Sequence, residues 1–397
     1  MNTNLSNNMF TFINNNDSCL SLQDIGEQFE KENYKKIHIK PILNLAKKYK
    51  QPICRNITSI NDNLQINIDE KYKNINNIFN DLKNMKQPEQ RTKEWYSLRE
   101  NMITASDIGA ILGKDKYRSP LEIMKRKLGY IKSDFNFAIM HGTKFEKIAQ
   151  MLYSHIFNTK VRQFGLIQSN KYLFLGASPD GINDKYTLND EFNKLYGRMI
   201  EIKCPTTRTI NNIGKIEDII SENYWCQVQI QLEICDLEEC DFVQCKFVEV
   251  SRDEIILDNI NKKDKNNYTF GNENLKIKDN LTRGGFLIIN NEHSYPPSLN
   301  LKLEDYDKWI INNINNSSKT GIIWWILQKI HVETIKRDRI WFQNNKDELK
   351  KFFDKMIYYK KNIQEFEQML DKNNKKQEDK KDYTLFSNSQ YSKIKFE

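Results

Sequence analysis

The chain has 397 residues, of which 29% are charged and 39% hydrophobic, and its formal net charge of +8 suits a polyanionic partner because cations that bind phosphates release counterions. The seven cysteines lack the two-residue spacing of zinc and iron–sulfur sites, which excludes those classes and indicates a reducing compartment. No apolar run reaches membrane-spanning length and no signal-peptide pattern is present, so we expect a soluble intracellular protein without a membrane partner.

Composition divides the chain into segments. The first part is rich in Asn, Lys and Ile, and Asn favours turns over helix interiors. The last part is highly charged, which is typical of disorder. The predicted segments are a partly disordered or helical N-terminal extension over 1–88, a folded domain over 89–300, a helical region over 301–375 and a charged tail over 376–397.

Hydrophobic periodicity between residues 89 and 250 predicts helices followed by strands. Helices are expected to start at Ser106 and Ser119, each followed by a residue typical of a helix start. Further elements are predicted as a helix over 137–157, strands over 161–168, 172–177, 197–203 and 242–250, a helix over 224–236, and an edge strand over 285–289. This order predicts an α/β fold with a central mixed β-sheet.

The C-terminal region carries apolar residues at steps of three and four from Leu349 to Leu370. Such a seam fits either an amphipathic helix packed on its own domain or a dimerising coiled coil. We favour the first interpretation.

A strand ending in Glu201-Ile202-Lys203 is the chemically informative stretch. Side chains alternate along a strand, so Glu201 and Lys203 share one face, and Pro205 ends the run. Asp180 lies upstream in a Pro-Asp-Gly turn. Carboxylates that converge on a hard cation beside a lysine are the components of a metal-dependent phosphodiesterase.

Each of these parts also has an ordinary structural interpretation. Glu-x-Lys is common on strands, and Pro-Asp-Gly is usually only a turn. Glu146, a candidate third carboxylate, lies on a helix where a surface position is the usual one. The combination in this order is much more specific than any part.

Polar residues elsewhere could assist such a site. Tyr224, Gln227 and Gln231 lie on one side of a predicted helix, where amides can hold a water or a phosphate oxygen; an ordinary polar face is the alternative. Arg99 and Ser106 lie near helix ends, which favour anions, although the residues alone favour a surface ion pair for Arg99.

Five motifs occur in one order along the chain, and together they resemble a known family. They are Thr104-Ala105-Ser106, Gly142-x-x-x-Glu146, Ala177-Ser178-Pro179-Asp180-Gly181, Glu201-x-Lys203-Cys204-Pro205 and Tyr224-x-x-Gln227-x-Gln229. The family is the phage lambda-type exonuclease family, also called the YqaJ-type viral recombinase family, within the PD-(D/E)xK nuclease superfamily. The resemblance covers about residues 90–250.

This resemblance implies a restriction-endonuclease-like core within a nuclease domain over 89–300. It implies a Mg²⁺-dependent 5′→3′ exonuclease, with Mn²⁺ as a substitute, that acts on linear double-stranded DNA in viral-type recombination or repair. The implied partners are DNA ends, a single-strand annealing protein and further copies of the chain. A catalytically silent DNA-binding protein and a restriction-like endonuclease remain alternatives.

The resemblance also implies residue roles. The catalytic set is Glu146, Asp180, Glu201, Lys203 and Gln227. The metal ligands are Asp180, Glu201 and the backbone carbonyl of Ile202, with Glu146 acting directly or through water. The residues for DNA and its 5′-phosphate are Arg99, Ser106, Ser178, Arg118 and Tyr224. Two departures from the family stand out: an insertion over 184–196, which we interpret as a hairpin, and long flanks that fit poorly with the family's ring-shaped trimer.

Overall fold

The computed structural model describes residues 72–131, 137–258, 267–314 and 320–372. The chain divides into two compact units, residues 1–74 and 75–397, and every element named below belongs to the second. Most of the predicted N-terminal extension and all of the tail over 376–397 lie outside the described residues. The predicted domain boundaries stay predictions.

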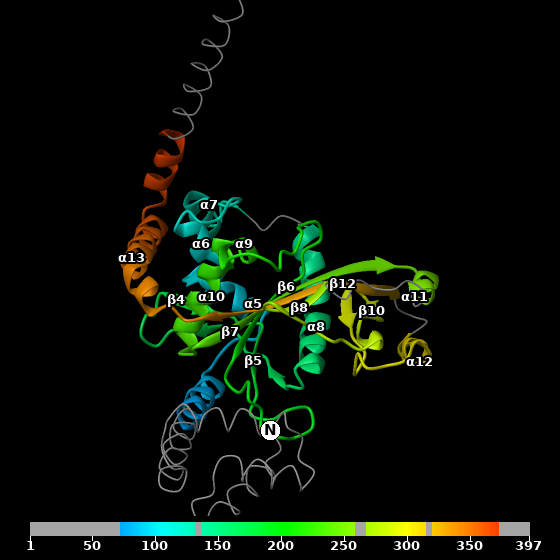
Figure 1. Ribbon diagram of the computed structural model, residues 1–397. Coiled ribbons are helices and arrows are strands. Elements are labelled where there is room, and N and C mark those ends of the chain that lie inside the picture. The colour runs from blue at the N-terminus through cyan, green and yellow to red at the C-terminus, as the bar shows by residue number, and fades with distance from the viewer. Residues whose placement is uncertain (1–71, 132–136, 259–266, 315–319, 373–397) are drawn as a thin grey trace, which may run out of the picture. The chain divides into compact units, whose positions relative to one another are not determined.

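A mixed β-sheet forms the centre of this unit (Figure 1). Its main path is β11-β10-β12-β7-β6-β5-β2, in which β6 and β7 run parallel and every other neighbouring pair is antiparallel. The strands are β2 Val161–Arg162, β5 Gly181–Asn183, β6 Met199–Lys203, β7 Glu239–Val250, β8 Tyr268–Phe270, β9 Glu273–Asn274, β10 Arg283–Ile289, β11 Glu292–Ser294 and β12 Thr320–Lys336. A small separate sheet has the order β1 Ile103–Thr104, β4 Leu175–Ala177, β3 Ile167–Gln168.

Helices flank the central sheet, which confirms the predicted α/β class. They are α5 Lys93–Glu100, α6 Ile108–Ile111, α7 Pro120–Lys127, α8 Phe137–Ile156, α9 Ile216–Ile219, α10 Glu222–Cys235, α11 Arg252–Asp258, α12 Leu303–Asn313 and α13 Arg339–Lys361. The apolar side of α8 packs on Ile200 and Ile202 of β6. The alternate residues of β6 face the other way, toward α10. None of the helices in the described ranges is long and apolar enough to cross a membrane.

The long strand β12 differs from the helical region predicted over 301–375. It pairs with β7 on one side and with β10 and β8 on the other, and Trp325, Leu327 and Ile330 are buried in the core. An interior strand has neighbours along both edges and need not alternate apolar and polar residues, so its periodicity resembles that of a buried helix. The edge-strand prediction over 285–289 is also wrong, because β10 pairs with β11 along one edge and with β12 along the other.

The C-terminal helices pack on their own unit, as favoured from the sequence. The seam is divided, because α13 ends at Lys361, with Asn362 as its C-cap, and a second helix follows over 363–372. Met356 and Phe366 from the two helices are buried together with Met124 of α7.

One buried carboxylate, Asp107, joins several of these elements. It ends the 3₁₀ helix Ala105–Asp107 and accepts hydrogen bonds from the backbone amide (3.1 Å) and hydroxyl (2.7 Å) of Thr104. It also pairs with Arg126 (2.6 Å) and Lys127 (2.8 Å) of α7. Burial alone would raise the pKa of Asp107, but the charges of Lys127 and Arg126 hold it well below its ordinary value of 3.8.

We predict that Asp107→Asn lowers the free energy of unfolding by about 3–5 kcal/mol, because it leaves the buried Lys127 ammonium without its carboxylate. Urea unfolding followed by circular dichroism measures the change. Asp354→Asn, which removes an exposed ion pair to Lys350, is the matched control and should cost about 1 kcal/mol or less.

The same prediction has a pH dependence. A carboxylate whose pKa is depressed in the folded state stabilises the fold above its unfolded pKa and loses that contribution as the pH falls. The stability difference between the parent and Asp107→Asn should therefore be complete at neutral pH and shrink below 3.8. A difference that is absent at neutral pH would contradict the role given to this ion cluster.

Candidate active site

The register of β5 against β6 brings Asp180 and Glu201 together. Gly181 pairs with Ile200 and Ile182 with Met199, so the next step of the same register sets Asp180 beside Glu201. The two strands stop pairing there, and the Ile202 amide donates instead to Asp180 Oδ2 at 2.7 Å. This bond fixes the Asp180 carboxylate at the end of β6, where the sequence placed the metal ligands.

Glu201 lies on the α10 side of β6 and is only 2% exposed. Its Oε1 accepts from Lys203 Nζ and from Gln227 Nε2, the latter at 2.6 Å, and its Oε2 accepts from Gln231 Nε2 at 2.8 Å. Lys203 Nζ also lies 4.8 Å from the ring centroid of Tyr224, a cation–π contact. The structure therefore brings the strand pair and the polar side of α10 together.

Glu146 approaches the same cluster from α8. The nearby charge of Glu201 raises the pKa of Glu146 and that of Lys203 lowers it, and Glu146 Oε2 forms an ion pair with Arg91 at 2.9 Å. One helical turn later, Gln150 Nε2 donates to the backbone carbonyl of Asp180 at 3.2 Å. The helix thus supplies both a third carboxylate and a support for the Asp180 turn.

The cluster carries more negative charge than its two cations balance. Burial, together with the charges of Glu201 and Glu146, raises the pKa of Asp180 well above its ordinary value. Burial also raises the pKa of Glu146, although the nearby Arg91 opposes this. Burial lowers the pKa of Lys203, but the charges of Glu201 and Asp180 raise it overall.

This donor set fits a hard divalent cation. No group of three or more His, Cys, Asp and Glu side chains suited to a metal occurs among the described residues, and Arg91 holds the third carboxylate, Glu146. Mg²⁺, however, is usually bound through one or two carboxylates with several waters. Asp180 and Glu201 are sufficient for that kind of site, and a cation there would compensate the surplus negative charge.

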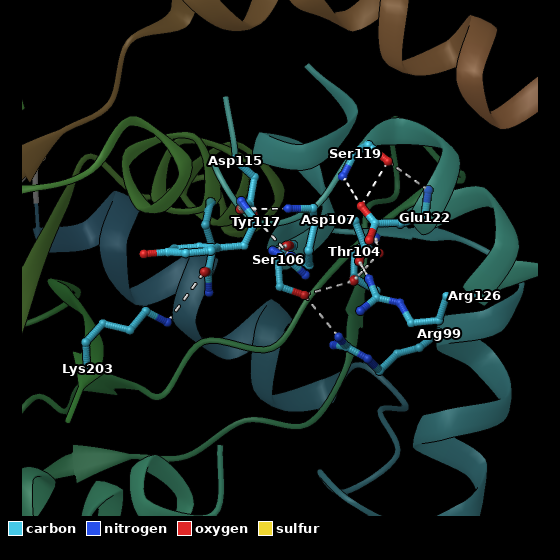
Figure 2. A network of polar contacts seen from close by, with 12 residues as sticks. Arg99, Thr104, Ser106, Asp107, Asp115, Tyr117, Ser119, Glu122, Arg126 and Lys203 are labelled. Carbon is cyan, nitrogen blue, oxygen red and sulfur yellow. Dashed lines mark hydrogen bonds and ion pairs between the residues drawn. The ribbon is translucent and has the colours of Figure 1, made fainter. Parts of the chain in front are cut away.

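A second, cationic cluster contains four of the five predicted phosphate-binding residues, of which Figure 2 labels Arg99 and Ser106. Arg99 donates to Ser106 Oγ at 3.1 Å, and Arg118 donates to the Ser106 carbonyl at 2.9 Å. Trp95 connects Ser178 to this cluster: its Nε1 donates to Ser178 Oγ at 2.9 Å, and its ring centroid lies 4.1 Å from the Arg99 guanidinium.

Arg99 is the cation of this cluster that is available to an anion. Asp107 is paired with Arg126 and Lys127, and Asp115 with Arg118. Within the described part of the chain, Arg99 forms no ion pair; its partners are the Ser106 hydroxyl and the Trp95 ring. The roles of Arg99, Ser106, Ser178 and Arg118 stay predictions, but the structure places them in one linked network.

Sequence reasoning missed Arg91 and Gln150. Gln150 had a signal, since it lies four residues after Glu146 on the same helical side. Arg91 had none, because its contact with Glu146 spans 55 residues. The insertion over 184–196 does form a hairpin, with a bridge between Tyr186 and Phe192.

Comparison with known proteins agrees with the sequence motifs. Residues 94–238 match the family model of the YqaJ-like viral recombinase domain. The resemblance to this family is confirmed. The matched segment includes every residue assigned a catalytic, metal-binding or phosphate-binding role from the sequence, from Arg99 to Gln227.

Relatives occur among viral proteins. An uncharacterized protein of Acanthamoeba polyphaga mimivirus is 30% identical over 319 residues, which are 73% of this chain and 56% of that protein. A protein of African swine fever virus is 27% identical over 144 residues, 32% of this chain and 42% of that one. The chain thus spans about half the length of these relatives.

A solved structure, the alkaline exonuclease of Laribacter hongkongensis, aligns with a TM-score of 0.40 at 19% identity, covering 70% of this chain and all of that one. The annealing protein and the homo-oligomer expected from the sequence stay predictions.

The surplus negative charge predicts how the site responds to Mg²⁺. A carboxyl whose pKa is raised in the fold destabilises it when ionised at neutral pH. Asp180→Asn should therefore melt at the same temperature as the parent or higher in EDTA. Mg²⁺ should raise the melting temperature of the parent by linkage and leave Asp180→Asn nearly unchanged.

Differential scanning fluorimetry measures both effects. The control Asp190→Asn changes an exposed carboxylate in the hairpin and should keep the full Mg²⁺ response. Equal responses of Asp180→Asn and the parent would exclude Asp180 as a ligand.

Proposed function

We propose that this protein is a metal-dependent deoxyribonuclease that degrades linear double-stranded DNA from its 5′ ends. The carrying observation is the position of Asp180 beside Glu201 and Lys203 at the end of β6, fixed by the bond from the Ile202 amide. The match to the YqaJ-like viral recombinase domain supports a function of the nuclease or recombinase class.

Asp180, Glu201 and the carbonyl of Ile202 would hold the cation. Bound there, Mg²⁺ would stabilise charge on the phosphate and lower the pKa of a coordinated water. Gln227 and Gln231 of α10 hold the Glu201 carboxylate in place through one hydrogen bond each, and Lys203 adds a third contact. Lys203, resting on Tyr224, would orient the attacking water and stabilise the negative charge of the transition state.

The Arg99 network supports the choice of exonuclease over endonuclease. A terminal phosphate carries more negative charge than an internal diester, and a guanidinium beside hydroxyl groups recognises such a group well. Arg99 with Ser106 supplies this combination. An endonuclease would need no receptor for a chain end.

Linear and closed-circular duplex DNA, incubated with Mg²⁺ or EDTA, test the function. We expect Mg²⁺-dependent degradation of linear DNA only. Lys203→Ala should slow it by roughly 100-fold or more, as the loss of a transition-state donor does. Lys351→Ala, an exposed lysine of α13, is the matched control and should retain the parent rate.

The other outcomes identify the alternatives. Cutting of circles would favour a restriction-like endonuclease. DNA binding without any hydrolysis would favour a silent DNA-binding protein. Full activity of Lys203→Ala would remove the proposed site altogether.

The proposed role of Arg99 as the site for the terminal 5′-phosphate gives a separate prediction. The parent should degrade 5′-phosphorylated ends faster than 5′-hydroxyl ends, and Arg99→Ala should abolish this preference, because the guanidinium contacts only the phosphorylated end. Rates on the two kinds of end measure it, with Arg339→Ala, an exposed arginine paired to Glu238, as control. A parent enzyme with no preference would reject the role of Arg99.

A further inference from the structure

A groove of about 550 Å³ lies on the sheet beyond the end of β6. Its floor is formed by β7 and β12 through Lys246, Val248, Ile326 and Lys329. These residues alternate along their strands with the core residues Phe247 and Leu327, so they occupy the sheet face opposite α8. Glu201 and Lys203 lie on that same face.

The groove lies on the same sheet face as the candidate active site, on the far side of the buried Gln244. Lys203 pairs in register with Gln244 of β7, and Lys246 follows two residues later on the same face, about 7 Å along the strand. The loop that leaves β6 forms the wall, with Thr209 and Ile210 lining the groove. One segment of chain therefore carries both Lys203 and this wall.

Two lysines face each other directly across the floor. Lys246 and Lys329 are registered partners on antiparallel strands, and like charges in such a position destabilise a sheet. The register shift between Leu327 and Lys329 is a β-bulge, and bulges commonly re-aim a side chain next to a functional site. Within the described ranges Lys246 has no carboxylate in ion-pair distance.

A further cation and an aromatic ring belong to the neighbourhood of the lysine pair. Arg208, in the same loop, donates to Gln244 Oε1 at 2.8 Å and lies over the Tyr224 ring. Lys329 donates to Asn212 Oδ1 at 2.9 Å, which ties β12 to that loop. Cations that follow a backbone, with apolar surface for bases between them, are typical of single-strand binding.

We propose that this groove binds a single DNA strand that passes Lys203, with Lys246 and Lys329 on its phosphates. The proposal rests on the proposed nuclease function for the direction of the strand, but the binding itself is independent of hydrolysis. A groove of this volume has the size of a small-ligand pocket, so it takes part of one strand and not a duplex. Its floor residues on β7 and β12 lie outside the segment 94–238 that matches the YqaJ-like domain, whereas its wall at Thr209 and Ile210 lies within it.

Fluorescence anisotropy with a labelled oligothymidylate in EDTA, over a series of salt concentrations, tests this proposal. Lys246→Gln/Lys329→Gln should bind several-fold more weakly, and the slope of log K against log salt should fall by about 1.4, since each single-strand phosphate contact contributes about 0.7. Lys246→Arg/Lys329→Arg, which keeps both charges, should retain most of the slope.

The control Lys351→Gln/Lys361→Gln removes the same charge from exposed positions of α13 and should leave the slope unchanged. Thermal melting checks the fold: the Lys246→Gln/Lys329→Gln protein should melt near the parent temperature. Thymidine monophosphate should compete poorly, since it offers one phosphate.

The outcomes separate this proposal from the nuclease function. An unchanged slope in Lys246→Gln/Lys329→Gln, or competition by the mononucleotide as strong as by the oligonucleotide, overturns the groove assignment even if the parent hydrolyses DNA. If Lys246→Gln/Lys329→Gln shows the reduced slope but the parent hydrolyses no DNA, the groove assignment is supported and the nuclease function is rejected.

Discussion

A carboxylate buried in protein must be compensated by donors or cations, and the site around Glu201 is built to meet this requirement. Lys203 reaches Glu201 from the same strand, while Gln227 and Gln231 reach it from α10. This arrangement requires α10 to lie against one face of β6, and the apolar contacts of Ile200 and Ile202 with α8 fix the other face. The position of both helices thus follows from one five-residue strand.

The same unit separates charge into two regions. Asp180, Glu201 and Glu146 form an anionic cluster that its neighbouring cations do not fully balance, whereas Arg99 belongs to a cationic network around Asp107. The proposed function would use both, because a cation-binding site suits the phosphate to be cleaved and a guanidinium suits a terminal one. Trp95 joins the two regions physically, since it contacts Arg99 and also holds Ser178, two residues before Asp180.

The parts that the sequence predicted are those with a local signal. Glu201 and Lys203 share a strand face by simple alternation, and Gln227 and Gln231 share a helix side by a step of four. The pairing of Arg91 with Glu146 and the register of β12 against β7 depend on contacts distant in sequence. The sequence predicts helix where β12 lies, because an interior strand loses the polar alternation that identifies an exposed one.

The central claim is that Asp180 and Lys203 act together at one catalytic centre. The most direct measurement is a double-mutant cycle on the Mg²⁺-dependent rate of linear DNA hydrolysis, with the parent, Asp180→Asn, Lys203→Met and the double variant. Residues that act as a unit are strongly non-additive, so the double variant should be about as slow as the slower single variant. If the rate of the double variant is reduced by the product of the two single-variant reductions, the two residues act independently, and this result would contradict the account.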